Sequence, residues 1–274
     1  MDSLRRRLRH YGLEPRKGLG QHFLASPGLL DRIAAAADLT PRDTVLEIGP
    51  GLGDLTVRLA QRAGRVVAVE VDTRLAPALE AVARRYPQVQ VVFGDILQQD
   101  LAALLGPGPF VVVANLPYYI TGAVLRHVWG GEPRPQRMVL LVQREVAARM
   151  TARPPRMNLL ALQTQLYGRP RVLFRVPARA FVPPPKVESA VVRVDARAQP
   201  RLPADQVPRF WRVARAAFGQ KRKQLRNALA AGLGLDKAAV EAWLQRADVD
   251  PRRRAETLAW EEWARLLATA PTIS

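Results

Sequence analysis

Alternation between apolar strands and amphipathic helices is the feature that most constrains the fold of this chain. Five apolar runs between residues 44 and 143 have the length and β-branched content of strands, and helical patterns such as DLTVRLAQRA separate them. The runs are TVLEIG (44–49), RVVAVEV (65–71), VQVVFGD (89–95), FVVVAN (110–115) and RMVLLVQ (137–143). Strands that are apolar throughout are buried on both faces, which is typical of a parallel sheet covered by helices. We therefore predict a doubly wound α/β fold for this part of the chain.

The pattern becomes helical in the last quarter of the sequence. RVLFRV and SAVVRVDA are two further strand candidates, and four amphipathic helical segments follow them. The expected core anchors of this helical part are its four tryptophans at helical spacing, Trp211, Trp243, Trp260 and Trp263. A chain of 274 residues is long enough for one large domain and a smaller one. The expected division is a basic arm over residues 1–25, an α/β domain over 26–200 and a small helical C-terminal domain over 201–274.

Composition excludes several kinds of site. The chain has no cysteine and only three scattered histidines, which excludes disulfides, thiol nucleophiles and zinc sites of the cysteine and histidine type. No apolar stretch reaches the roughly 18 residues that a membrane span requires. The basic N-terminus lacks the apolar core of a signal sequence. We therefore expect a cytoplasmic protein with no membrane segment and no metal.

The net charge of +18 indicates a polyanionic partner. Of the 42 basic residues, 37 are arginine, whose planar guanidinium binds phosphate in a bidentate manner. The charge is uneven, because residues 134–197 hold thirteen basic residues against three acids. Base-composition bias or adaptation to heat accounts for part of the preference for arginine but does not require so large a net charge. A nucleic acid along one side of the molecule is the simpler explanation.

Polar residues and glycines follow four successive predicted strands. These residues are Gly49, Gly51 and Gly53 after the first strand, Glu70 after the second, Asp95 after the third and Asn115 after the fourth. Ligands of doubly wound sheets bind at the carboxyl ends of the strands, where an acid about twenty residues after the glycines can accept ribose hydroxyls. A single acid at a strand end is more often a turn or helix cap. The glycine spacing also differs from the dinucleotide fingerprint, which needs a gap of three after its second glycine.

Seven motifs together resemble a known family. GQHFL, EIGPGLGDLT, VEVD, GDIL, NLPYYIT, FVPPPKVESAVV and FGQKRKQLRNAL occur in this order. They are similar to motifs of the S-adenosylmethionine-dependent ribosomal RNA adenine dimethyltransferases, and most similar to the small-subunit enzymes of the KsgA type. The resemblance runs from about residue 9 to 265. It implies a Rossmann-like methyltransferase sheet with a small helical C-terminal domain.

The resemblance also assigns the cofactor site. It places contacts to S-adenosylmethionine at Gln21, His22, Leu24, Gly49, Gly51, Glu70, Asp95, Ile96 and Asn115. His22 departs from the family pattern, because bacterial members usually have asparagine at this position. An imidazole can still donate one hydrogen bond there.

The motif NLPYYIT is the predicted catalytic segment. The exocyclic amine of adenine is a poor nucleophile, because its lone pair is delocalised into the ring. We expect the side-chain oxygen of Asn115 and the carbonyl of Leu116 to accept the two amine hydrogens and direct the lone pair at the methyl group. Pro117 would fix this turn, and Tyr118 would stack on the flipped base. Phe181 resembles the second base-facing aromatic of the family, although it is also explained as a packed residue beside a proline run.

Basic residues outside this motif are the predicted RNA contacts. They are Arg144, Lys186, Lys221, Arg222, Lys223 and Arg226. A merely solvated basic face is the alternative interpretation of the last four, and a disordered tail is the alternative for Arg5, Arg6, Arg7 and Arg9.

The resemblance implies an enzyme that dimethylates N6 of two adjacent adenosines in the 3′-terminal hairpin loop of 16S rRNA. Its partner would be a small ribosomal subunit precursor, and we expect it to act as a monomer. Two alternatives remain: a non-catalytic ribosome-assembly factor on the same fold, and a large-subunit rRNA adenine methylase. The presence of Glu70, Asp95 and NLPY argues against the first alternative.

Overall fold

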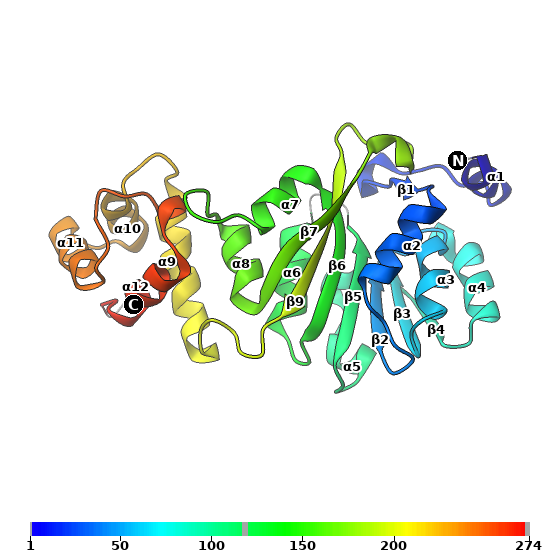
Figure 1. The fold of residues 1–274 in the computed structure, drawn as a ribbon, viewed down its shortest axis with the longest axis horizontal. Helices are drawn as coiled ribbons and strands as arrows, with labels where there is room; N and C mark the ends of the chain where they lie inside the picture. Colours follow the sequence, from blue (N-terminus) through cyan, green and yellow to red (C-terminus); the bar gives the residue numbers. More distant parts are fainter. Residues whose placement is uncertain (1, 117–119, 272–274) are drawn as a thin grey trace. The chain divides into compact units, whose positions relative to one another are not determined.

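The computed structural model describes residues 2–116 and 120–271, which belong to two compact units (Figure 1). The first unit comprises Met1–Ala148 and Arg169–Ala196, and the second comprises Arg149–Gly168 and Arg197–Ser274. Each unit has an apolar core of its own, so each is described by itself.

A seven-stranded sheet with the order β4-β3-β2-β5-β6-β9-β7 forms the centre of the first unit. The strands are β2 (Thr44–Ile48), β3 (Arg65–Glu70), β4 (Val89–Phe93), β5 (Phe110–Asn115), β6 (Pro135–Gln143), β7 (Gly168–Val176) and β9 (Ser189–Ala196). The neighbours from β4 to β6 pair in parallel, and β9 pairs antiparallel with β6. All five predicted strands are present, and the two further candidates form β7 and β9. The predicted α/β fold is confirmed, although the sheet is mixed because β9 runs in the opposite direction.

The central strands are buried on both faces, as their uninterrupted apolar sequences predict. Val45 and Val111 are fully buried in a cluster with residues of α2 and α3, and the adjacent Leu46 and Val112 are fully buried on the opposite face. The helices of this unit after its arm are α2 (Pro27–Ala36), α3 (Asp54–Ala60), α4 (Ala76–Arg85), α5 (Leu101–Leu105) and α6 (Thr121–Gly130). Helix α7 (Arg144–Met150) follows β6 in sequence, and the boundary between the units falls after its residue Ala148.

The N-terminal arm is folded. Helix α1 (Asp2–His10) is followed by a 3-10 turn (Lys17–Leu19) and by the short strand β1 (Phe23–Leu24). Strand β1 pairs antiparallel with β8 (Phe181–Val182), so the arm contacts a segment from the far end of this unit's sequence. The disordered tail considered for the arginine run is therefore not what the structure shows.

The second unit is helical. It contains α8 (Leu159–Tyr167), α9 (Val207–Gly219), α10 (Leu225–Leu233), α11 (Lys237–Arg246) and α12 (Trp260–Ala268). Trp243, Trp260 and Trp263 are buried in its core beside Phe210, whereas Trp211 is only partly buried against it. The ring of Phe210 stacks on Trp260 with 5.4 Å between the centroids, and the indole of Trp243 donates a hydrogen bond to the Leu266 carbonyl (2.9 Å). Three of the four tryptophans are thus core anchors, as expected.

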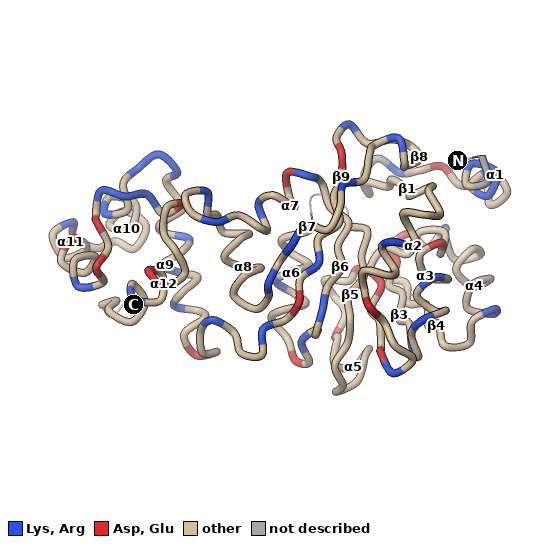
Figure 2. Tube along the Cα trace, viewed as in Figure 1, with Lys and Arg blue, Asp and Glu red and all other residues tan. Residues whose placement is uncertain are grey.

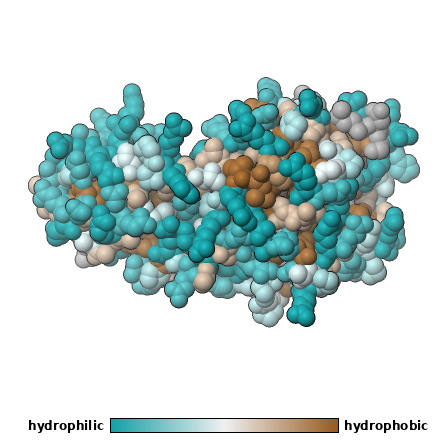
Figure 3. All heavy atoms as spheres, in the orientation of Figure 1, coloured by the Kyte–Doolittle hydropathy of each residue, from teal (hydrophilic) through white to brown (hydrophobic). Residues whose placement is uncertain are grey.

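The surface of the described residues is mainly polar. Side chains on the face seen in Figure 3 are mostly hydrophilic, with smaller apolar areas between them. The large apolar side chains that are well exposed among the described residues are Val71, Val172, Leu173 and Val187. No helix in the described ranges is both long and apolar enough to cross a membrane.

Candidate active site

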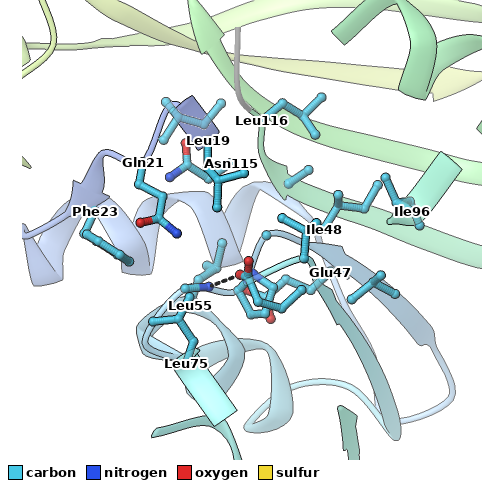
Figure 4. Close-up of a pocket in the computed structure, with 18 of the residues that line it drawn as sticks. Leu19, Gln21, Phe23, Glu47, Ile48, Leu55, Leu75, Ile96, Asn115 and Leu116 are labelled. Carbon is cyan, nitrogen blue, oxygen red and sulfur yellow. Dashed lines mark hydrogen bonds between the residues drawn. The ribbon is translucent and has the colours of Figure 1, made fainter. Parts of the chain in front are cut away.

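A cavity of about 250 Å³ lies at the carboxyl ends of β2, β3, β4 and β5 (Figure 4). All nine residues predicted to contact the cofactor line it: Gln21, His22, Leu24, Gly49, Gly51, Glu70, Asp95, Ile96 and Asn115. The structure brings them together because the ends of adjacent parallel strands meet at one edge of the sheet. The arm segment that carries the first three covers this edge from outside the sheet.

The turn after β2 requires glycine. Gly49, Gly51 and Gly53 have φ angles of 72°, 61° and 82°, in the left-handed region that other residues rarely adopt. A Cβ atom on Gly53 would lie 2.8 Å from Cγ2 of Val82, and one on Gly49 would lie 3.3 Å from the Asn115 carbonyl oxygen. The turn therefore brings bare backbone close to the end of β5 and opens a space for a ligand.

Glu70 at the end of β3 is tied to this turn. Its Oε2 accepts a hydrogen bond from the Gly51 amide (3.1 Å), and its Oε1 accepts one from the Asp72 amide (3.0 Å). Burial raises the pKa of Glu70, and these backbone hydrogen bonds oppose the rise. A carboxylate oxygen can accept two hydrogen bonds, so each oxygen retains capacity for a ligand hydroxyl.

Asp72 connects β3 to the covering segment of the arm. Its hydrogen bonds with the Arg74 guanidinium lower its pKa to about 2, against the effect of burial. Gln21 donates from Nε2 to Asp72 (2.8 Å) and accepts at Oε1 from the Arg16 amide (2.8 Å). Both polar atoms of the Gln21 side chain therefore hold the covering segment in place, so its role in this structure is to position that segment.

Glu47 is a site residue that the sequence did not reveal. It is the last but one residue of β2 and lines the cavity, with only 1% of its surface exposed. Neither carboxyl oxygen has a hydrogen-bond partner of normal geometry among the described residues. Burial raises its pKa to about 8, the charges of Glu70 and Asp54 add to the rise, and the nearby Thr56 hydroxyl opposes it. A carboxyl group with this pKa is protonated at neutral pH.

The end of β4 supplies an acid, Asp95, and the end of β3 supplies an apolar side chain, Val71. Asp95 caps the 3-10 turn Ile96–Gln98 by accepting from the Leu97 amide (2.9 Å), as a single acid at a strand end often does. It still lines the cavity, as do Ile96 and Val71. Val71 is 52% exposed and follows Glu70, so its apolar side chain faces the opening. Val71 was not among the predicted site residues, because the sequence shows it only as the last residue of an apolar strand.

Asn115 at the end of β5 has a fixed orientation. Its Nδ2 donates to the backbone carbonyl of His22 at 3.2 Å, so its Oδ1 is the atom that remains to accept hydrogen bonds. The amide of Leu116 donates to the Leu141 carbonyl (3.2 Å), which keeps the chain beside β6. Pro117 and Tyr118 lie outside the described residues.

Comparison with known proteins identifies the family. The model of the ribosomal RNA adenine dimethylases matches residues 12–270. The chain belongs to this family. It is 50% identical over 257 residues to the ribosomal RNA small subunit methyltransferase A of Dehalococcoides mccartyi strain 195, covering 93% of this chain and 88% of that protein. The corresponding protein of Pelotomaculum thermopropionicum is 46% identical over 273 residues, covering 94% and 92%.

Two solved structures share the fold. The 23S rRNA methyltransferase ErmE is 31% identical with a TM-score of 0.72, over 90% of this chain and 98% of that one. A dimethyladenosine transferase from Plasmodium falciparum is 27% identical with a TM-score of 0.76, over 90% and 96%. The predicted resemblance to the dimethyltransferase family and the Rossmann-like methyltransferase fold are both confirmed.

The cavity suits the methyl donor of the family, S-adenosylmethionine. The glycine turn leaves room for a ligand against its backbone, Glu70 has capacity for two hydroxyl donors, and Val71 offers an apolar surface. The carboxyl group of Glu47 lines the cavity and has no hydrogen-bond partner of normal geometry among the described residues, so it can hydrogen-bond a ligand there. Among the described residues no group of three or more metal-ligating side chains is present.

Phe181 lies beside the cavity but does not line it. Its ring is 2% exposed and packs in the core with Leu24, Leu30 and Ile33. Its backbone pairs with Leu24 in the β1–β8 ladder, so it lies on the strand next to the covering segment. In this structure Phe181 is a packed residue, and a role in stacking on the base would need its ring to become accessible.

The predicted RNA contacts fall into separate groups. In the first unit, Arg144 pairs with Glu188 (3.1 Å) and Lys186 is exposed. In the second unit, Lys221, Arg222 and Lys223 are exposed in the connection between α9 and α10. Arg226 on α10 forms an ion pair with Glu241 (2.7 Å), so part of its charge is used within the protein.

Proposed function

We propose that this protein dimethylates the N6 amines of two adjacent adenosines in the 3′-terminal hairpin loop of 16S rRNA. Family membership and the 50% identity to a ribosomal RNA small subunit methyltransferase A support this substrate. The observation that carries the chemistry is the orientation of Asn115, whose Nδ2 is held by the His22 carbonyl. This hydrogen bond orients the side-chain amide so that its oxygen is left to accept hydrogen bonds beside the cofactor cavity.

Two acceptors would activate the adenine amine. The Asn115 side-chain oxygen and the Leu116 carbonyl would each accept one amine hydrogen, which draws the nitrogen toward tetrahedral geometry and localises its lone pair. The rate enhancement then comes from positioning and from stabilisation of the charge that develops on nitrogen. The displaced proton passes to water, so no strong general base is needed. For the second methylation the pocket must also admit the monomethylated amine.

The cavity residues would hold the cofactor for this reaction. Glu70 would accept the ribose hydroxyls, Asp95 would accept the adenine amine, and the Gly49–Gly51 backbone would lie against the methionine part. S-adenosylmethionine, when bound, supplies an electrophilic methyl group with a neutral thioether as leaving group. Tyr118 and Phe181 would stack on the flipped base, which for Phe181 requires movement of the β8 segment.

We propose that the protein acts as a cytoplasmic monomer without a metal, on a small ribosomal subunit precursor. The basic residues Lys221, Arg222 and Lys223, together with Arg144 and Lys186, would contact RNA phosphates. This role is supported by the surface exposure of Lys186, Lys221, Arg222 and Lys223.

A transfer assay with labelled cofactor tests the proposal. Purified protein is incubated with radiolabelled S-adenosylmethionine and small ribosomal subunits that lack the modification, with large-subunit rRNA as the parallel substrate. Dimethyladenosine from the small subunit alone is the expected product. Label in large-subunit RNA would assign the protein to the activity named for ErmE, which is 31% identical. Tight subunit binding without label would identify a non-catalytic assembly factor.

A further inference from the structure

Helix α1 lies before the residues that the family model matches. It covers Asp2–His10, outside the residues 12–270 that the family model matches. Leu4 and Leu8 are 4% and 5% exposed and pack in one cluster with Leu52, Leu75 and other residues of the first unit. A solvated tail would leave both leucines exposed. The helix is therefore a built part of the first unit.

Polar contacts fix the helix in one orientation. Arg7 donates to the Leu52 carbonyl (2.7 Å) and forms an ion pair with Asp54 at the start of α3. Gly12, with φ of 62°, ends the helix in a left-handed conformation, and Leu13 then returns to the same apolar cluster. One face and one flank of α1 are thus attached to the glycine turn of the cofactor site.

The opposite face of α1 is basic. An α-helix turns by about 100° per residue, which places Arg5, Arg6 and Arg9 together on the side away from Leu4 and Leu8. All three arginines are exposed, and none forms an ion pair with the acidic side chains that the structure describes. Figure 2 shows this blue helix beside β1 and β8 in the first unit. Three like charges therefore lie together on this face, with no ion pair to any acidic side chain that the structure describes.

Helix α1 lies next to the cofactor cavity. Leu52 and Leu75, on which α1 packs, also line the cofactor cavity. Val182, a third member of the cluster, follows Phe181 in β8. An RNA strand that delivers a base to Asn115 would therefore pass close to α1.

We propose that Arg5, Arg6 and Arg9 bind phosphates of the RNA strand next to the target adenosine. This inference rests on the proposed function and extends its RNA contacts to an element outside the family model. Guanidinium groups bind phosphate in a bidentate manner, and a docked helix presents them with little loss of conformational entropy. The helix thus orients the strand as well as attracting it.

A membrane surface is the other anionic partner that a basic amphipathic helix can have. Such helices bind by inserting their apolar face below the lipid headgroups. The apolar face of α1 is already buried against the first unit, so only its charges remain available. The structure therefore favours RNA, and vesicles become a control in the test.

The salt dependence of RNA binding tests the proposal. The probes are unmodified small ribosomal subunits and an RNA hairpin whose loop contains two adjacent adenosines. Each phosphate contact to a single strand contributes about 0.7 to the slope of log affinity against log salt. The R5A/R6A/R9A variant is expected to bind more weakly and to lose about 2 from this slope, with an unchanged cofactor affinity and Tm. The R5K/R6K/R9K variant, which keeps the charge, should recover most of the slope.

A matched control separates a local contact from the loss of net charge. Arg42, Arg84 and Arg85 are exposed and lie before β2 and β4, at the opposite edge of the sheet from the cavity. The R42A/R84A/R85A variant should keep the wild-type slope. Equal slopes for the two alanine variants would overturn the proposal, as would loss of binding to phosphatidylserine vesicles with unchanged RNA binding. Methylation by the wild-type protein is measured in parallel, because its absence would overturn the proposed function instead.

Discussion

The side-chain amide of Asn115 donates a hydrogen bond to the backbone carbonyl of His22 over 3.2 Å, although 93 residues separate them in sequence. His22 also contacts the Pro183 carbonyl through Nδ1 (2.8 Å), next to the segment that carries Phe181. The covering segment of the arm therefore contacts both the proposed catalytic amide and the β8 segment. Gln21 fastens the same covering segment to Asp72, two residues after Glu70. One stretch of chain thus links the cofactor side of the site to the base side.

Replacement of Asn115 tests the acceptor mechanism. Asn115→Ala removes the side-chain oxygen and is expected to lower the rate of methyl transfer by about 100-fold or more, as loss of a transition-state hydrogen bond does. RNA binding should survive, because the phosphate contacts are elsewhere. Asn115→Asp keeps an acceptor oxygen but loses the donor to His22, so an intermediate rate is expected. Single-turnover transfer measures both, and near wild-type turnover of the alanine variant would contradict the mechanism.

Replacement of His22 tests whether the covering segment positions the β8 segment. His22→Ala removes the contact with the Pro183 carbonyl but keeps the backbone carbonyl that holds Asn115. Loss of one such hydrogen bond should raise the KM for RNA by about 2- to 12-fold. The kcat and the cofactor affinity should change little. His22→Asn, the usual family residue, can donate again and should restore the KM. A fall in kcat with an unchanged KM would show that the contact does not position the base pocket.

Glu47 gives the protein a specific pH dependence of stability. Its folded pKa of about 8 exceeds the usual value of 4.5, so between these values the unfolded chain releases a proton that the folded protein keeps. Stability from this group is complete below the lower value and is lost as pH rises through the higher one. Glu47→Gln should remove this loss, so the variant should gain Tm relative to wild type from pH 5 to 9. Thermal unfolding of both proteins without cofactor measures the difference, and a constant Tm difference across this range would refute the assignment.

The sequence predicted the sheet and the edge that carries the site for one physical reason. Strands buried on both faces are apolar throughout, so their ends are marked by the first glycine or polar residue, as at Gly49, Glu70 and Asn115. Because neighbouring parallel strands end at the same edge, residues far apart in sequence were expected to meet there. All nine predicted cofactor residues do line one cavity.

Other features depend on contacts that leave no local pattern. In the sequence, Glu47 is a single polar residue within a predicted strand, and only the fold shows that it is buried beside the cavity. The pairing of β1 with β8 involves two residues on each side, too few for a periodic signal. The arginine run at the N-terminus resembles a solvated tail, because the leucines that dock it find their partners about fifty residues away and beyond.

The glycine turn supplies a last prediction, on stability. Gly53 has φ of 82°, and a Cβ atom there would lie 2.8 Å from the Val82 side chain, so Gly53→Ala combines backbone strain with a steric clash. The expected destabilisation is about 1–3 kcal/mol, with weaker cofactor binding because the turn moves. Gly28 in α2 is the control, because it has no positive φ and a Cβ atom added there would have no neighbouring atom within 4 Å. Gly28→Ala should be neutral or stabilise by up to about 1 kcal/mol, since alanine favours the helix. Urea unfolding compares the two variants, and equal stabilities would mean that the turn tolerates a side chain and that its glycines serve another purpose.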